Sequence, residues 1–125
     1  MLVIIATVLA GLIGAAVILM GAQFFWKPQA AAGFGIPGTP TEDAVFQSWL
    51  HVKGVRDIAA GLGIVILAAA ATPHLLGWYL LATTAIPVGD ALIVLRSKGP
   101  KATAYGVHFA TAAVMLVISV LLLVG

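Results

Sequence analysis

Three ionisable side chains lie at similar depths inside the hydrophobic segments of this chain. Asp57 and His108 each lie six residues after the start of such a segment, and Asp90 lies six before Arg96, the boundary residue that follows another. At the helical rise of about 1.5 Å per residue, each offset is about 9 Å. Carboxyl and imidazole groups donate and accept protons. The three groups therefore predict proton-transfer chemistry, with Asp57 and Asp90 as acid and base and His108 as a proton relay.

Further side chains share the helical face of Asp57. Trp49, Lys53 and Arg56 precede it at spacings that place all four on one side of a helix. We expect Arg56 to keep one carboxylate ionised and Lys53 to bind a ligand beside it. Trp49 is expected to stack on a bound molecule.

A second polar face surrounds His108. Tyr105 lies one helical turn nearer the membrane surface, and Thr111 and Met115 continue the stripe beyond His108. Tyr105 is expected to relay protons or orient a substrate, and Thr111 is expected to contact the ligand.

The composition requires a membrane environment for these groups. Of the 125 residues, 62% are hydrophobic and only 8% are charged, and the mean hydropathy is +1.17. Soluble domains have about a quarter of their residues charged, so a soluble enzyme and a disordered segment are excluded. The net charge of +2 gives no basic patch for nucleic acid. The chain is therefore expected to be one integral membrane domain, with the lipid bilayer as its partner.

The hydrophobic segments predict an all-α bundle of four transmembrane helices in one domain. Each spanning helix needs about 20 apolar residues. Four segments meet this length, at about 2–22, 51–71, 75–95 and 102–123. The connection over 23–50 is predicted to be a loop that ends in the start of an interfacial helix. We expect it to lie as a lid over the polar cluster around Asp57, Asp90 and His108.

Local signals mark where these helices begin and bend. Thr39 is predicted to be an N-cap, with Pro40 at the first helical position and Glu42 completing a capping box. Pro87 predicts a kink, because its ring displaces the backbone hydrogen bond to Thr83. Small residues at 10–15 favour close packing within the bundle, with a homodimer seam as the alternative.

The charges are distributed unevenly across the predicted membrane. All ten lie in the two longer connections or in the adjacent halves of the spans. The positive-inside rule therefore places the longer loops in the cytoplasm and both termini outside the cell membrane.

No metal or cofactor is expected at the polar cluster. The three histidines lie on separate segments without the short spacing of a metal site, and the chain has no cysteine. The G-x-G-x-x-G pattern at 33–38 lies between two membrane helices, whereas a dinucleotide site requires this pattern between a strand and a helix.

One motif carries a resemblance. The run Trp49–Asp57, followed by Gly61, resembles the core motif of a family of short four-helix membrane proteins catalogued as a domain of unknown function. The overall layout is also similar to the broader DoxX-like group. The resemblance implies a four-helix membrane fold and no established activity.

Two kinds of explanation remain open for the cluster. In the structural one, Lys53 or Arg56 neutralises Asp57 and Asp90, and His108 completes a hydrogen-bonded network. In the functional one, a pocket open toward the cytoplasm binds a lipophilic small molecule for isomerisation, cyclisation or epoxide opening. An ionised side chain in the hydrocarbon region costs at least about 2.5–3.5 kcal/mol, so it persists when it pairs with another charge or serves a function. Hydrogen bonds in membranes yield little stability each, which favours the functional explanation. A proton-coupled transporter and a non-catalytic accessory protein are the alternatives.

Overall fold

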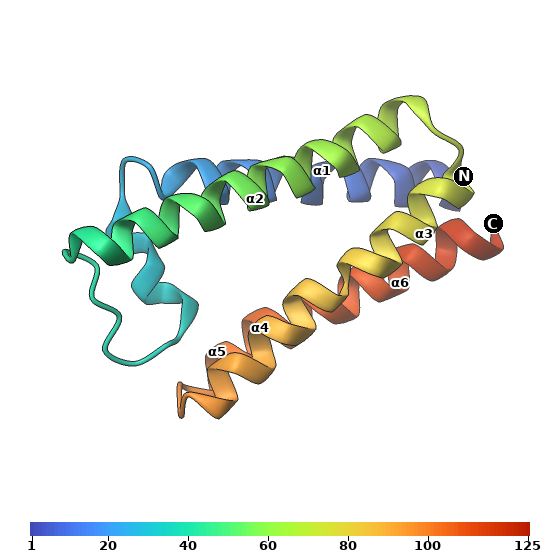
Figure 1. Ribbon diagram of the computed structural model, residues 1–125. Helices are drawn as coiled ribbons and strands as arrows, with labels where there is room; N and C mark the ends of the chain where they lie inside the picture. The colour runs from blue at the N-terminus through green and yellow to red at the C-terminus, as the bar shows by residue number, and fades with distance from the viewer.

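The computed structural model describes residues 1–125 and contains helices and no strands (Figure 1), which confirms the predicted all-α class. The helical elements follow in this order: α1 (Leu2–Gln23), the 3₁₀ segment η1 (Pro28–Phe34), α2 (Ala44–Ala70), α3 (Pro73–Thr83), α4 (Ala85–Arg96), the short α5 (Lys101–Thr103), the π-helical segment η2 (Ala104–Phe109) and α6 (Ala110–Val124).

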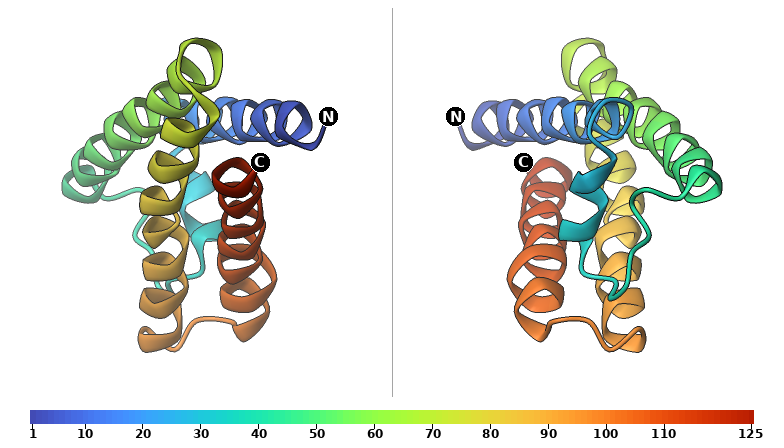
Figure 2. Two further views of the ribbon diagram at one scale, coloured as in Figure 1. Left: turned by 90° about the vertical axis from the view of Figure 1, so that its right-hand side faces the viewer. Right: turned by 90° about the vertical axis from the view of Figure 1, so that its left-hand side faces the viewer.

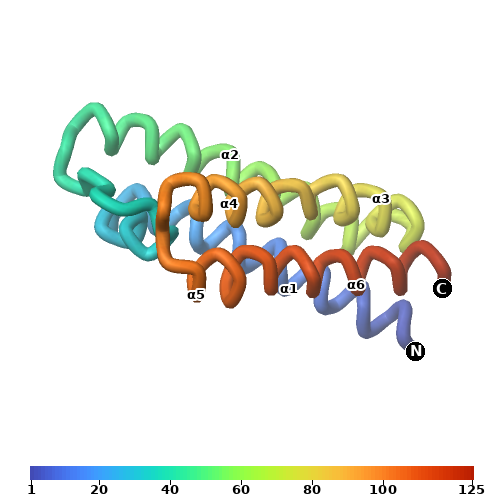
Figure 3. Tube along the Cα trace, turned by 90° about the horizontal axis from the view of Figure 1, so that it is seen from below, coloured from blue at the N-terminus to red at the C-terminus, as the bar shows by residue number.

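The helices form two antiparallel pairs. α1 packs along α2, and α3 and α4 together run beside η2 and α6. The pairs meet at the end that carries both termini and diverge toward the other end, where η1 lies between them (Figures 1 and 2). The view from below shows the termini together at one end and the two longer connections at the other (Figure 3). This is the predicted placement of termini and loops.

Three helical stretches are long and apolar enough to cross a membrane: Leu2–Gln23, Pro73–Arg96 and Lys101–Val124. α2 has 27 residues. However, every 18-residue stretch of it contains Lys53, Arg56 and Asp57. Because of these three charged residues, α2 is not among the helices apolar enough to cross a membrane by composition. The predicted count of four spanning helices is therefore not confirmed.

Glycines bring α1 and α2 close together at two levels. A Cβ added to Gly61 would lie 2.5 Å from the carbonyl oxygen of Gly14, and one added to Gly54 would lie 2.6 Å from that of Gly21. Both distances are too short for any side chain, so only glycine allows this approach. The small residue at position 14 therefore serves packing inside the chain, as the first alternative predicts.

The main core occupies the half of the molecule that carries the termini. Its buried members come from α1, α2, α3 and α6: Ala6, Ala10, Ile64, Leu76, Leu80, Met115, Ile118 and Leu122. At this end His74 Nε2 also lies 2.6 Å from the carbonyl oxygen of Leu123, which joins α3 to α6.

The predicted start of the second helix is wrong. α2 begins at Ala44, and its N-cap is Asp43, whose carboxylate accepts from the backbone N–H of Phe46 at 2.8 Å. Thr39 instead donates its hydroxyl to the carbonyl of Ile36 at 2.6 Å. Aspartate caps a helix at least as well as threonine, and Asp43 directly precedes the uninterrupted helical run.

The predicted interruption near Pro87 is present. α3 and α4 are separated at Thr84, whose hydroxyl donates to the carbonyl of Leu80 at 2.8 Å. Proline has no N–H to donate to the residue four positions before it, so the helix is interrupted on the N-terminal side of Pro87. This break precedes Asp90 by about one and a half turns.

Candidate functional site

A partly open cavity of about 370 Å³ lies at the end of the molecule where the helix pairs diverge. Its walls come from the end of α1, from η1 and the following loop, from the first half of α2 and from α4. The lining residues are Phe24, Ala31, Phe34, Ile36, Pro37, Gly38, Thr39, Pro40, Phe46, Trp49, Leu50, Lys53, Asp90 and Ile93. The segment 23–50 therefore forms most of the wall, in keeping with its predicted place over the polar cluster.

The cavity wall is mostly apolar, with two charged residues and the hydroxyl-bearing Thr39. Four aromatic side chains line it: Phe24, Phe34, Phe46 and Trp49. Trp49 is 69% exposed, so it lies at the rim, whereas Phe24 is buried. The charged lining residues are Lys53 and Asp90 alone.

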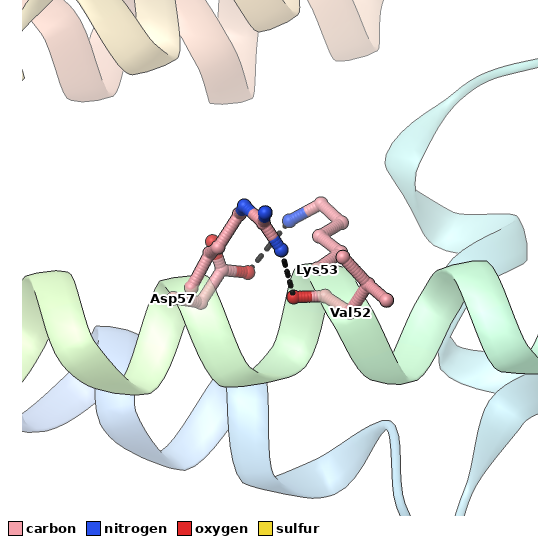
Figure 4. A network of polar contacts seen from close by, with 4 residues as sticks. Val52, Lys53 and Asp57 are labelled. Carbon is pink, nitrogen blue, oxygen red and sulfur yellow. Dashed lines mark hydrogen bonds and ion pairs between the residues drawn. The ribbon is translucent and has the colours of Figure 1, made fainter.

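Lys53 is held in an ion pair with Asp57. Its Nζ lies 2.6 Å from Oδ2 of Asp57, one turn further along α2 (Figure 4). The same ammonium group lies 5.2 Å from the ring centre of Phe24 and 5.5 Å from that of Phe34. Both distances suit a cation–π contact. The charge of Lys53 is thus compensated inside the protein.

Asp90 has no such partner. It is half-buried and lines the cavity, and its carboxylate makes no hydrogen bond or ion pair with another side chain. Lys53, Asp57 and His108 are the ionisable side chains close enough to influence this carboxylate. The structure therefore gathers three ionisable groups around Asp90 and leaves its carboxylate open to the cavity.

His108 is buried, with 8% of its surface exposed. Its Nε2 lies 2.8 Å from the carbonyl oxygen of Phe34, and the two rings pack with their centres 4.5 Å apart. His108 does not line the cavity. It holds the end of η1, which carries part of the cavity wall.

The stripe predicted around His108 does not form a single face. Tyr105 is 57% exposed and stacks on Phe109, and Thr111 is exposed with its hydroxyl on the carbonyl of Val107. The cause is the π-helical segment η2, whose wider turns change the direction of side chains relative to an α-helix. Neither Tyr105 nor Thr111 reaches the cavity.

Arg56 also lies outside the cavity. Its side chain is exposed, and its guanidinium lies 3.4 Å from the carbonyl oxygen of Val52. It forms no ion pair with Asp57 or Asp90. Of the predicted site residues, the structure brings Trp49, Lys53 and Asp90 to the cavity, with Asp57 and His108 directly behind it.

The aromatic wall was not predicted from the sequence. Phe24, Phe34 and Phe46 all lie in the segment 23–50, for which the hydrophobic pattern predicts only a connection. Large aromatic residues in a segment outside the predicted spans are a sequence signal that this segment packs on an apolar surface of the protein. No group of three or more histidine, aspartate or glutamate residues is close enough to hold a metal ion.

Comparison with known proteins gives a family and no activity. No curated protein and no solved structure matches the chain. The family model described as a domain of unknown function, DUF4267, matches residues 14–122. The match includes the second half of α1, all elements from η1 to η2, most of α6 and all of the cavity-lining residues. The chain therefore belongs to the DUF4267 family of proteins.

Proposed function

We propose that this protein binds a lipophilic small molecule in the cavity between its two helix pairs. The observation that carries the proposal is the cavity itself: about 370 Å³, with aromatic and aliphatic walls and two charged residues. Small-molecule sites have volumes of about 300–1,000 Å³, mostly apolar walls and few polar groups. A molecule that partitions into the bilayer would reach such walls without crossing water.

Asp90 is the proposed acid–base group. Its carboxylate is free of internal partners and faces the cavity, whereas the Asp57 carboxylate is occupied by Lys53 at 2.6 Å. Among the chemistries predicted, isomerisation suits one free carboxylate best, because the proton removed from one atom of the substrate returns to another.

We propose that α2 is the fourth spanning helix. The Lys53–Asp57 ion pair supports this, because pairing lowers the cost of placing both groups in the hydrocarbon region. Arg56 lies on the exposed surface, from which its long side chain can extend toward the headgroups. With the longer loops in the cytoplasm, the cavity would open toward the cytoplasmic leaflet.

The position of the cavity favours binding over transport. Its lining residues all lie within 24–53 and 90–93, at the end away from the termini. The other half of the molecule is occupied by the packed core around Leu76, Leu80 and Leu122. A transporter would need a path to both sides of the membrane, and the cavity reaches one end.

The proposal is tested by filling the cavity. Ala31 is buried in η1 and lines the cavity, so Ala31→Phe would occupy its volume. Ala69→Phe, on the exposed side of α2, is the matched control. Organic extracts of wild type and both variants, purified from membranes, are compared by mass spectrometry. A lipophilic molecule retained by wild type and Ala69→Phe but lost from Ala31→Phe supports the proposal, and identical extracts from all three refute it.

A further inference from the structure

We propose that the lipophilic ligand carries a positive charge, with its ammonium group against Asp90 and its hydrocarbon part along the aromatic wall. This inference rests on the proposed function and specifies the class of ligand. Two observations support it: the cavity has more carboxylates than ammonium groups, and aromatic side chains surround these charges.

The charges at the cavity do not balance. One ammonium group, that of Lys53, faces two carboxylates, those of Asp57 and Asp90. Lys53 is bonded to Asp57 at 2.6 Å, and Arg56 is turned to the exposed surface. The negative charge of Asp90 is therefore left without a bonded cation, at a site walled by apolar groups where an unpaired charge is costly.

The surrounding side chains suit a cation. Four aromatic rings line the cavity, and the faces of aromatic rings attract ammonium groups within about 6 Å. Lys53 already uses Phe24 and Phe34 in this way, at 5.2 and 5.5 Å. Trp49 and Phe46 make no such contact with Lys53, so their ring faces are available to a ligand. A carboxylate beside free aromatic rings is the chemistry that recognises a lipophilic amine or quaternary ammonium compound.

An anionic ligand would meet the opposite situation. It would have to displace Asp57 from Lys53 and would place a third negative charge beside Asp57 and Asp90. A neutral ligand would fit the walls but would leave the charge of Asp90 uncompensated. The site therefore discriminates by charge, in the order cation, neutral molecule, anion.

The test compares three probes with the same ten-carbon chain: decyltrimethylammonium, decanol and decyl sulfate. Binding to the full-length protein in phosphatidylcholine nanodiscs is followed by the fluorescence of Trp49, with Trp26→Phe and Trp78→Phe removing the other two tryptophans. Empty nanodiscs measure partition into the lipid. We expect the ammonium probe to bind about tenfold or more tightly than decyl sulfate, since charge-assisted and cation–π contacts act together.

Two variants separate the role of Asp90 from general attraction of cations. Asp90→Asn should remove the preference for the ammonium probe. Glu42→Gln, which removes the same charge from an exposed position outside the cavity, should retain it. Equal binding of ammonium and sulfate probes to the wild type, or an unchanged preference in Asp90→Asn, overturns the inference.

The outcomes also distinguish this inference from the proposed function. If decanol binds and Ala31→Phe abolishes its binding, while charge makes no difference, the lipophilic cavity stands and the cationic ligand is rejected. If none of the three probes binds beyond its partition into empty nanodiscs, both proposals are rejected.

Discussion

Nε2 of His108 lies 2.8 Å from the backbone carbonyl oxygen of Phe34, although 74 residues separate them in the chain. A carbonyl oxygen only accepts, so Nε2 carries the hydrogen and donates it. The bond joins the π-helical segment η2 to the end of η1. Because Phe34 lines the cavity, this contact fixes part of the cavity wall from the opposite helix pair.

Loss of the imidazole should release η1. In His108→Ala the Phe34 carbonyl loses its donor and its ring loses a packing partner, which we expect to cost about 1–3 kcal/mol. The expected result is faster amide hydrogen exchange over residues 28–34, measured by mass spectrometry on the protein in detergent micelles. His74→Ala is the matched control, because His74 makes a similar contact to the Leu123 carbonyl at the other end of the molecule. Equal exchange over 28–34 in His108→Ala and wild type would contradict the assignment.

The two carboxylates of the cluster should differ in their effect on stability. Asp57→Asn deprives Lys53 of its partner at 2.6 Å. Because the Lys53 side chain is 40% exposed, we expect a loss of about 0.2–1 kcal/mol. Asp90→Asn breaks no internal bond and removes a charge that has no bonded partner, so the variant should be as stable as the wild type or more stable. Thermal unfolding followed by circular dichroism in detergent gives the comparison. A larger loss from Asp90→Asn than from Asp57→Asn would show that Asp90 is a structural group.

The fold was predictable because hydrophobic length and charge distribution act over whole segments. The helical class and the grouping of the termini follow from these two properties. The break near Pro87 is predictable for a different reason, because the missing N–H of proline acts locally. The start of α2 was predicted wrongly because Thr39 and Asp43 both have capping side chains, and their choice depends on the path of the preceding loop.

The site was predictable only in part, because some of its contacts join segments that are far apart in the sequence. The Lys53–Asp57 pair is separated by four residues on one helix and can be inferred from the sequence. The place of Asp90 beside it followed from matching depths. The aromatic wall depends on the contact between His108 and Phe34, which no local pattern encodes. The π-helical turn that directs Tyr105 and Thr111 away is likewise not marked by a local sequence signal.

The α1–α2 contact should tolerate no side chain at its glycines. A Cβ at Gly61 would lie 2.5 Å from the Gly14 carbonyl oxygen, so we expect Gly61→Ala to lose about 1–3 kcal/mol through overpacking. Gly89→Ala makes the same chemical change in α4, where a Cβ meets no atom within 4 Å. It should be neutral or stabilising, since alanine favours a helix over glycine by about 1 kcal/mol. Similar melting temperatures for the two variants would show that the two helices can separate without cost.

The topology can be tested with single cysteines, because the chain contains none of its own. Glu42→Cys lies just before α2, Ala70→Cys at its end, and Ser97→Cys in the short basic loop; all three positions are exposed. If α2 spans the membrane with the longer loops in the cytoplasm, a membrane-impermeant maleimide labels Ala70→Cys in intact cells. The other two variants then react only in inverted membrane vesicles. The opposite pattern for all three would reverse the orientation. Labelling of Glu42→Cys and Ala70→Cys from one side would show that α2 lies along the membrane surface, and the Lys53–Asp57 pair would then be located in the headgroup region.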